Sequence, residues 1–402
     1  MSTPPGQAPS AQRPAPELRR WEFATATEIV FGAGSREILP DRIRREGARA
    51  LVVTGGGPGR SGAVLDAVRL AGVEVAHWSL GHEPTIDDAR TAAGLARDQA
   101  VEVVVGIGGG STIDLAKAVA ALVTNGGDPL DYLEVIGRGL PLVQRPLPFI
   151  AVPTTAGAGA EVTRNAVLIS PHEGVKASLR SPLMLPRLAV VDPELTLTLP
   201  PDISAATGMD ALAQLLEPYV SSRANPITDP LCLDGLGLVA RSLRRAWTDG
   251  ADLDARTNMS LAALFGGLAL ANAALGAVHG FASAIGGRFD APHGAVCAAL
   301  LPAVVRVNVA ALAARGTTSG ATARYVTAAR VMTGHDDARA EDLVALLQQL
   351  RTDLAIPGLR AYGLADRDTS AIIEAAARAS SMRGNPVALN TAELHAVLDA
   401  AL

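Results

Sequence analysis

Apolar and polar positions change in blocks along the first half of the chain. Short runs rich in Val, Ile and Leu are each followed by a stretch with the spacing of an amphipathic helix. Uninterrupted apolar strands are typical of parallel sheets whose two faces are covered by helices. The pattern therefore predicts a doubly wound α/β domain. Its strands are expected at 50–54, 73–80, 101–110, 148–155 and 188–193, and its helices at 61–72 and 85–100.

The pattern changes after about residue 201. Strand signals fade and runs with helical spacing follow one another, which predicts an all-α C-terminal domain. A disordered tail is expected before both domains, because residues 1–16 contain five prolines and no apolar segment. The expected domain boundaries are 1–17, 18–200 and 201–402. The helices are expected at 204–221, 230–247, 256–278 and 340–356.

The stretch Leu261–Val278 raises the question of a membrane span, because Asn272 is its only polar side chain. Ten of its eighteen residues are Ala or Gly, which contribute little to membrane insertion but allow close helix packing. We therefore expect a buried core helix that ends at His279, and no membrane partner.

Composition narrows the class of protein. Lys and Arg number 35 and Asp and Glu number 40, which gives a net charge of −5 with no basic block. This excludes the usual electrostatic footprint of a nucleic-acid-binding protein, so a small-molecule partner is expected. Cys232 and Cys297 lie far apart and form no C-x-x-C pattern, which argues against a disulfide framework or a zinc knuckle. A reducing cytoplasm is the expected compartment.

Two glycine-rich segments follow predicted strands, at 54–62 and 106–120. In the second, the order of strand, glycines, Ser111 and helix lets backbone N–H groups meet a phosphate at a helix N-terminus. Glycine turns without a nucleotide are also common in α/β proteins, and neither segment is spaced as G-x-G-x-x-G. Lys117, one of only two lysines, lies in the helix that follows, either because a compact ammonium is needed there or by chance.

A third loop, 151–165, follows an apolar strand and combines hydroxyls with glycines. Thr154 and Thr155 can donate to a ribose or a phosphate, and Gly157 and Gly159 let the backbone approach a ring. The alternative is a turn whose threonines only cap the next helix.

Four residues of the second domain carry potential metal ligands. Asp210 and Gln214 are four positions apart on a predicted helix and so share one face. His279 ends the apolar helix, and His293 follows Pro292, which suits the first turn of the next helix. Carboxylate and imidazole groups are donors that Zn²⁺ and Fe²⁺ accept, so their convergence predicts a divalent metal site with a position open for substrate. The alternative is that both histidines are hydrogen-bonded core residues.

Longer motifs resemble the iron-containing (group III) alcohol dehydrogenase family. The resemblance runs from about Trp21 to the C-terminus and implies the dehydroquinate synthase-like fold of that family, with a cleft between the two domains. It implies NAD(P)-linked oxidation of an alcohol, or reduction of an aldehyde, at Fe²⁺ or Zn²⁺. It also implies a homodimer, with residues 27–31 as a candidate edge strand for pairing. The motifs are FGAGS, GIGGGSTIDLAKAVA, VPTTAGAGAEVT, VVDPELTLTLPP, TGMDALAQLLEPYVS, ANPITDPLC, HGFASAIGG and PHGAVCAALLP.

The resemblance also implies individual site residues. Gln214 departs from the family, which usually has histidine there, so the ion keeps either a weak amide donor or only three protein ligands. Ser283 stands where many relatives have a further histidine, and a proton relay would then run through its hydroxyl and a water. The implied metal ligands are Asp210, Gln214, His279 and His293. The implied cofactor contacts are Gly55, Gly56, Gly109, Gly110, Ser111, Asp114, Thr154, Thr155, Gly157, Lys176 and Leu195.

The choice of cofactor follows from the end of the first strand. Family members that prefer NAD often have an aspartate there, which binds the ribose hydroxyls and repels a 2′-phosphate. This chain has Gly55, Gly56 and Gly57, with Arg60 nearby, so NADP(H) is preferred over NAD(H). Two alternatives stay open: a maleylacetate reductase-like enzyme acting on an acidic carbonyl compound, and a nucleotide-binding protein with impaired catalysis, which Gln214 motivates.

Overall fold

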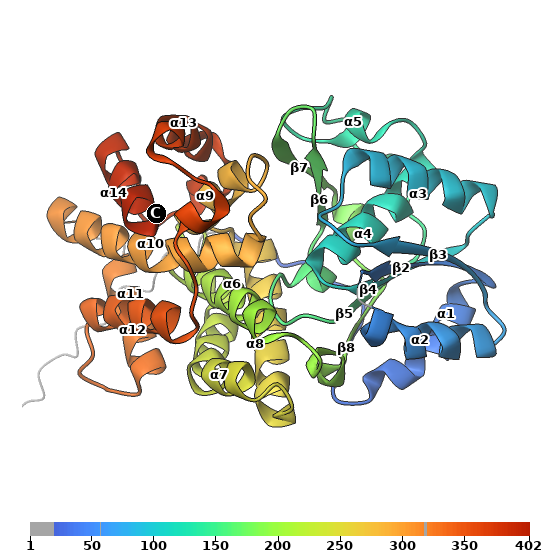
Figure 1. The fold of residues 1–402 in the computed structure, drawn as a ribbon, viewed down its shortest axis with the longest axis horizontal. Coiled ribbons are helices and arrows are strands. Elements are labelled where there is room, and N and C mark those ends of the chain that lie inside the picture. Colours follow the sequence, from blue (N-terminus) through green and yellow to red (C-terminus); the bar gives the residue numbers. More distant parts are fainter. Residues whose placement is uncertain (1–19, 57, 317–319) are drawn as a thin grey trace, which may run out of the picture.

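The computed structural model describes residues 20–56, 58–316 and 320–402, with the backbone alone at 58–60. The predicted tail over 1–17 lies outside the described residues, as do Gly57 and the side chain of Arg60. The described chain folds into an α/β half and a helical half that lie side by side (Figure 1). The predicted fold class is therefore confirmed.

Six strands form one parallel sheet in the order β1-β8-β5-β4-β2-β3. Alternate residues of a strand point to opposite faces, so Ala50 and Val52 pack under α1 and α2, whereas Leu51 and Val53 pack under α3 and α4 (Figure 1). The strands are β1 (Ile29–Phe31), β2 (Arg49–Gly55), β3 (Glu74–Leu80), β4 (Val103–Gly108), β5 (Phe149–Pro153) and β8 (Leu188–Val191). The helices are α1 (Leu39–Glu46), α2 (Pro58–Leu70), α3 (Ile86–Asp98), α4 (Gly110–Asn125) and the short α5 (Pro129–Tyr132).

The direction of winding reverses between β2 and β4. From β2 the chain moves outward to the edge strand β3 and then returns to β4 on the other side of β2. In open α/β sheets, ligands bind at the carboxyl ends of the strands at such a switch point. Gly55 ends β2 and the glycines from Gly108 to Gly110 end β4 and begin α4, so both predicted glycine loops meet there.

The described residues of the second half form helices and no strands, as predicted. Among the described residues, α10 alone, or α10 and the bent pair α8–α9, has the length and composition to cross a membrane, but 83% of the apolar window of α10 is buried, as in a core helix. The helices are α6 (Pro201–Val220), α7 (Thr228–Thr248), α8 (Leu253–Ala273), α9 (Ala277–Ile285), α10 (His293–Arg315), α11 (Ala321–Thr333), α12 (Ala340–Asp353), α13 (Thr369–Arg378) and α14 (Thr391–Ala401).

The prediction of one continuous helix over 261–278 is wrong. The chain leaves helical geometry at Ala274, whose φ is 62°, and α8 and α9 meet at 96°. The new helix is stabilised from outside, because Ala277 N–H and Val278 N–H donate to the side chains of Asn385 and Glu217. His279 therefore lies in the first turn of α9 rather than at the end of a long helix.

The hairpin of β6 (Asn165–Ser170) and β7 (Val175–Arg180) was not predicted. Its two antiparallel strands lie outside the main sheet and reach toward the helical half, where β7 contacts α9 (Figure 1). The two halves also touch where a Cβ on Gly159 would lie 2.4 Å from the Cα of Gly267 in α8. Such close backbone contact fixes the α/β half against the helical half.

Candidate metal centre and cofactor cleft

Three side chains predicted to bind a metal meet in the helical half. Asp210 lies on α6, His279 on α9 and His293 at the start of α10. Asp210 Oδ1 is 3.3 Å from His279 Nε2 and 3.9 Å from His293 Nε2. Cys297, one turn after His293, completes a group whose potential ligand atoms all lie within 4.8 Å of one another. The sequence analysis therefore predicted correctly that the carboxylate and both imidazoles lie together, but it did not predict the thiol of Cys297.

The carboxylate of Asp210 is buried, and only one of its two oxygens accepts a hydrogen bond. Oδ2 accepts a hydrogen bond from Gln214 Nε2 at 2.9 Å, whereas Oδ1 has no hydrogen-bond donor among the described residues. Burial opposes ionisation of this group, but the two neighbouring imidazoles outweigh it and hold the pKa of Asp210 below its usual value. A buried, ionised oxygen beside two imidazole nitrogens is chemically suited to a divalent cation. The residues present thus fit the metal that the resemblance implies.

Glu217 orients the ring of His279. Glu217 Oε2 lies 2.6 Å from His279 Nδ1, and Oε1 accepts from Val278 N–H at 2.6 Å. A proton on Nδ1 leaves Nε2 to face Asp210, which is the usual arrangement of a metal-binding histidine and its carboxylate partner. Burial lowers the pKa of His279, but Cys297, Asp210 and Glu217 outweigh it and raise this pKa well above the usual value.

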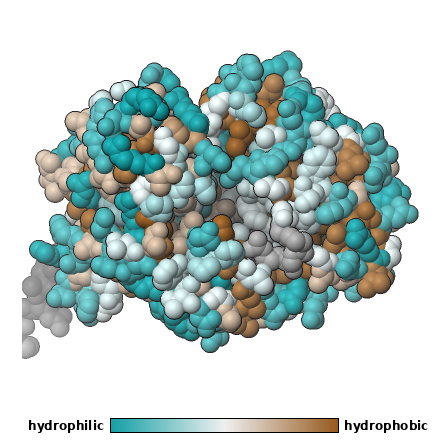
Figure 2. All heavy atoms as spheres, viewed as in Figure 1, coloured by the Kyte–Doolittle hydropathy of each residue, from teal (hydrophilic) through white to brown (hydrophobic). Residues whose placement is uncertain are grey.

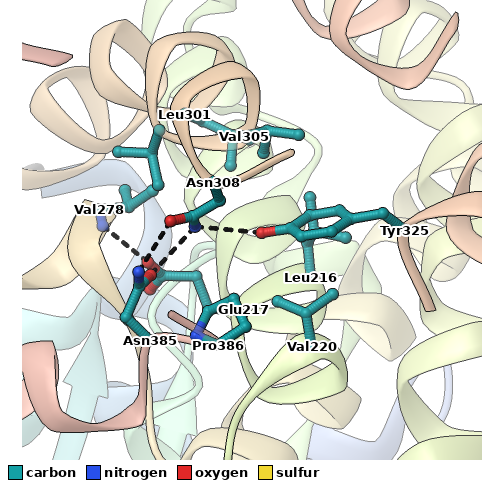
Figure 3. A pocket seen from close by; sticks show the side chains of 12 residues that line it. Leu216, Glu217, Val220, Val278, Leu301, Val305, Asn308, Tyr325, Asn385 and Pro386 are labelled. Atoms are coloured by element: carbon teal, nitrogen blue, oxygen red, sulfur yellow. Dashed lines mark hydrogen bonds between the residues drawn. The ribbon is translucent and has the colours of Figure 1, made fainter. Parts of the chain in front are cut away.

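A polar network lies behind Glu217 (Figure 3). Asn308 and Asn385 exchange hydrogen bonds of 2.7 and 3.0 Å, and Asn308 Nδ2 also donates to Tyr325 Oη at 3.1 Å. The cavity between these groups and the apolar side chains around them measures about 10 Å³, room for about one water at most. The support of His279 is therefore tightly packed, and sequence reasoning missed Glu217 because its role depends on the start of α9.

Gln214 faces Asp210 with its amide nitrogen. A carboxylate oxygen accepts from an NH₂ group but repels an amide oxygen, so the Asp210 side chain fixes this orientation. Gln214 Oε1 is buried and, within the described chain, has no hydrogen-bond partner. Both predicted alternatives therefore stay open: the amide oxygen must turn toward the ion to bind it, or the ion has only three protein ligands.

The site is open on the side of His293. The His293 side chain is 34% exposed, whereas those of Asp210 and His279 are 4% and 6% exposed. Partial burial and the nearby charges of His279 and Lys176 lower the pKa of His293, so this ring is neutral and able to bind a cation.

Ser283, one turn after His279 on α9, is exposed. The space-filling view shows a hollow between the two halves of the molecule (Figure 2).

The cofactor loop after β4 has a helix N-terminus available for an anion. Gly109 is the N-cap of α4, and no described side chain caps this helix. Gly109 and Gly110 are partly exposed, as is Ser111 in the first turn. N–H groups at such a terminus bind phosphates readily. A Cβ on Gly110 would lie 2.8 Å from the Cβ of Ala158, so the loop after β5 packs directly against this turn.

The loop after β5 lies between the glycine turns and α6, the helix that contains Asp210, and contacts both. Thr154 N–H donates to Gly108 O at 2.9 Å, and Thr155 lies beside Gly109. A Cβ on Gly157 would lie 2.7 Å from the Cβ of Thr207, one turn before Asp210 on α6. The segments predicted to bind the cofactor and those predicted to bind the metal are thus in direct contact.

Lys117 is a buried structural residue. Its ammonium donates to the carbonyl oxygens of Ala160, Thr163 and Asn165 and to Thr163 Oγ1, at 2.8 to 3.0 Å. These acceptors lie in the loop after β5 and at the first residue of β6, so Lys117 holds that loop in place. Burial lowers the pKa of Lys117 to about 8, despite the attraction of Asp114 and Glu161.

Three other implied cofactor residues lie around the same region. Asp114 Oδ2 accepts from Val167 N–H and so connects α4 with β6, and desolvation raises the pKa of Asp114 to about 6. Lys176 Nζ, on β7, is 3.4 Å from Glu83 Oε2. Leu195 is buried in the 3₁₀ turn after β8. Gly55 ends β2 at the switch point, and Gly56 follows it.

Comparisons with known proteins agree with this architecture. The family model described as iron-containing alcohol dehydrogenase matches residues 26–193, and the C-terminal model of the same family matches residues 204–402. The chain belongs to the iron-containing alcohol dehydrogenase family. It is 36% identical over 395 residues to a 1,3-propanediol dehydrogenase of Klebsiella pneumoniae, covering 94% of this chain and 98% of the relative.

Two further relatives extend the comparison. Alcohol dehydrogenase 4 of Saccharomyces cerevisiae is 35% identical over 375 residues, which cover 92% of this chain and 95% of the relative. A crystal structure of a 1,3-propanediol oxidoreductase superposes with a TM-score of 0.88 at 32% identity, covering 96% of this chain and all of the other. The predicted activity, metal-dependent and NAD(P)-linked oxidation of alcohols or reduction of aldehydes, is confirmed at the level of this family.

Proposed function

We propose that Asp210, His279 and His293 hold one divalent cation, Fe²⁺ or Zn²⁺, and that the chain interconverts small primary alcohols and aldehydes with NADP(H). The observation that carries the proposal is the buried Asp210 Oδ1, which lies beside two imidazole nitrogens and has no hydrogen-bond donor in the described chain. A bound divalent cation polarises an alcohol or carbonyl oxygen, and a nicotinamide ring carries the hydride. The substrate class is supported by the relatives named as 1,3-propanediol and alcohol dehydrogenases.

The protein's own residues position these groups. The N-terminus of α4, with Gly109, Gly110 and Ser111, binds the pyrophosphate, and Gly55 and Gly56 adjoin it at the end of β2. Thr154, Thr155 and Gly157 line the nicotinamide side, where the loop after β5 touches α6. Asp114, Lys176 and Leu195 complete the cofactor surface. Ser283, exposed on α9, moves a proton between the substrate and water.

The proposed preference for NADP(H) rests on the end of β2. Gly55 and Gly56 place no carboxylate where a 2′-phosphate would lie. Among the described residues, a Cβ on Gly55 would meet only Thr112 Oγ1, at 3.4 Å, so these residues leave room for a side chain at this position. We expect Gly55→Asp to weaken NADPH use and to improve NADH use, as measured by kcat/KM with each cofactor. An unchanged cofactor ratio would contradict the proposal.

The proposed assembly is a homodimer in the cytoplasm. The strand β1 (Ile29–Phe31) lies within the predicted segment 27–31, at the edge of the six-stranded sheet, and no described strand pairs with its outer side. Pairing of this edge with that of a second copy would form the dimer. The proposed domain boundary stays near residue 200, where β8 and its 3₁₀ turn give way to α6.

A catalytically impaired nucleotide-binding protein is the second candidate. The observation that favours it is the hydrogen bond from Gln214 to Asp210, which occupies one carboxylate oxygen. The two functions are separated by metal analysis of the purified chain together with NADPH consumption in the presence of a panel of aldehydes. Bound metal with turnover supports the enzyme, whereas metal-free protein that binds NADPH without turnover supports the second candidate.

Two variants, measured in the same experiment, test whether Asp210 and His279 form the metal site. We expect Asp210→Ala and His279→Ala each to abolish turnover while NADPH still binds, because both residues lie away from the glycine turns. Activity close to that of the wild type in both variants would defeat the proposed site.

A further inference from the structure

Cys297 faces the same point as the proposed metal ligands. It lies four residues after His293 on α10, so both side chains project from one face of the helix. Its Sγ is 3.6 Å from His293 Nε2 and 3.9 Å from His279 Nε2, and the residue is fully buried. Sγ contacts these two imidazole nitrogens and also lies within 4.8 Å of the potential ligand oxygen of Asp210. The thiol is therefore part of the cluster rather than a neighbour that packs elsewhere.

Four of the six distances between potential ligand atoms correspond to contacts in the structure, and they lie close to those of a tetrahedral centre. Bonds of about 2.0–2.1 Å to nitrogen or oxygen and about 2.3 Å to sulfur place tetrahedral N and O ligands about 3.3 Å apart, and N and S ligands about 3.6 Å apart. The structure has 3.3 and 3.9 Å from Asp210 Oδ1 to the imidazoles, and 3.6 and 3.9 Å from Cys297 Sγ to them. Small movements would bring all four atoms to one ion.

An independent observation points into the same space. Asp210 Oδ1 is buried and, among the described residues, has no hydrogen-bond donor. Gln214, one turn further along α6, does not fill the space with an oxygen, because its amide nitrogen is turned to Asp210 Oδ2.

We propose that Cys297 binds the divalent cation as a thiolate and is the fourth protein ligand beside Asp210, His279 and His293. The inference rests on the proposed function, because it assumes a cation at those three residues. A thiolate is a soft ligand, and a tetrahedral site that includes sulfur favours Zn²⁺ over Fe²⁺. Zinc centres in enzymes also expand from four to five ligands, so a fourth protein ligand is compatible with substrate binding.

X-ray absorption at the zinc edge of the full-length, zinc-loaded chain tests this assignment. We expect one sulfur neighbour at about 2.3 Å and N or O neighbours at about 2.0–2.1 Å. In the cobalt-substituted chain we expect a sulfur-to-cobalt charge-transfer band in the near ultraviolet. Both signals come from the wild-type chain, so they do not depend on whether a variant folds.

Two variants and a matched control complete the test. Cys297→Ser and Cys297→Ala should lose the sulfur neighbour, and Cys297→Ser should weaken zinc binding by more than the roughly 10–100-fold typical of losing an outer hydrogen-bond partner. Cys232→Ser changes the other buried cysteine, on α7, and should keep the sulfur signal.

The outcomes separate the inference from the function on which it rests. Bound zinc with only N and O neighbours in the wild type, or a sulfur signal that persists in Cys297→Ser, would overturn the inference and leave the three-ligand site. A chain that binds no added zinc or iron would overturn the proposed function itself.

Discussion

The carboxylate of Glu217 contacts two groups at the start of α9. One oxygen accepts from Val278 N–H and the other contacts His279 Nδ1, so a single side chain caps the helix and orients the imidazole. A carboxylate near a helix N-terminus is also favoured by the helix dipole. The position of the proposed metal ligand and the start of its helix thus depend on the same residue.

Glu217→Gln should therefore disturb the proposed metal site without leaving a cavity, because the two side chains have nearly the same size. The amide oxygen keeps the bond to Val278 N–H, but the NH₂ group then faces His279 Nδ1 and favours a proton on Nε2, the atom that faces Asp210. We expect metal affinity to fall by roughly 10–100-fold, as measured by competition with a chromophoric chelator. Glu161→Gln, the same change at a buried glutamate of the α/β half, is the control and should leave this affinity unchanged. Equal affinities in all three proteins would refute the role of Glu217.

Glu161 provides a prediction on stability and pH. Burial raises its pKa from 4.5 to about 7, although Lys117 lies nearby. The folded state therefore holds a proton that the unfolded state releases between pH 4.5 and 7, and stability is lost as the pH rises through this window. Glu161→Gln removes this term. We therefore compare the free energy of unfolding of Glu161→Gln with that of the wild type. The difference between them should grow, in favour of the variant, by up to about 3 kcal/mol from pH 4.5 to 7. Thermal unfolding at several pH values measures it, and a difference that does not change with pH would contradict the assignment.

At the residue scale, the sequence analysis predicted that three proposed ligands meet, from helix periodicity and from the recognised motifs. Asp210, His279 and His293 were placed correctly in one cluster. Cys297 and Glu217 were not predicted, because nothing in their local sequence says which helices pack against them. The four-residue spacing of His293 and Cys297 was a usable signal, since it places both on one face of a helix.

Among the elements, the N-terminus of α4 is the part of the α/β half with the clearest chemical role. Gly110→Ala tests it, because the added Cβ would lie 2.8 Å from the Cβ of Ala158 and must displace either the helix or the loop after β5. We expect the dissociation constant of NADPH to rise roughly tenfold while metal content stays unchanged. Fluorescence titration with NADPH measures the constant, and wild-type affinity would contradict the proposed phosphate site.

Gly94→Ala in α3 is the matched control for this substitution. A Cβ at Gly94 would meet no described atom within 4 Å, so the change adds helix propensity without a clash. It should leave NADPH affinity unchanged and raise the free energy of unfolding by about 0.5–1 kcal/mol.

Most elements with a strong local pattern were predicted, whereas two features formed by tertiary contacts were not. Helices α1, α5, α11, α13 and α14 had no predicted range. Strands β2, β3, β4, β5 and β8 and helices α2 and α3 follow from apolar runs and helical spacing. The break between α8 and α9 does not, because its apolar sequence continues through Ala274 and the new helix is capped by Glu217 and Asn385 from distant segments. The β6–β7 hairpin was missed for a similar reason, since its strands pair with each other outside the main sheet.

For the whole molecule, the two halves are joined so that the glycine turns and the metal cluster lie on neighbouring segments. The contact between Gly157 and Thr207 links the loop after β5 to α6, and that between Gly159 and Gly267 links the same region to α8. A small apolar cluster that includes Val162, Val191 and Leu264 packs across the contact between the two halves. The placement of a dinucleotide against a cation is thus a property of the interface between the halves.

The most direct measurement removes the metal and restores it. The chain is treated with a chelator, its metal content is determined, and NADPH binding and aldehyde reduction are measured before and after addition of Zn²⁺ or Fe²⁺. We predict that the stripped protein binds NADPH but does not turn over, and that either added ion, at stoichiometric occupancy, restores turnover in the wild type and not in Asp210→Ala. Full turnover by protein shown to be free of metal would contradict the account.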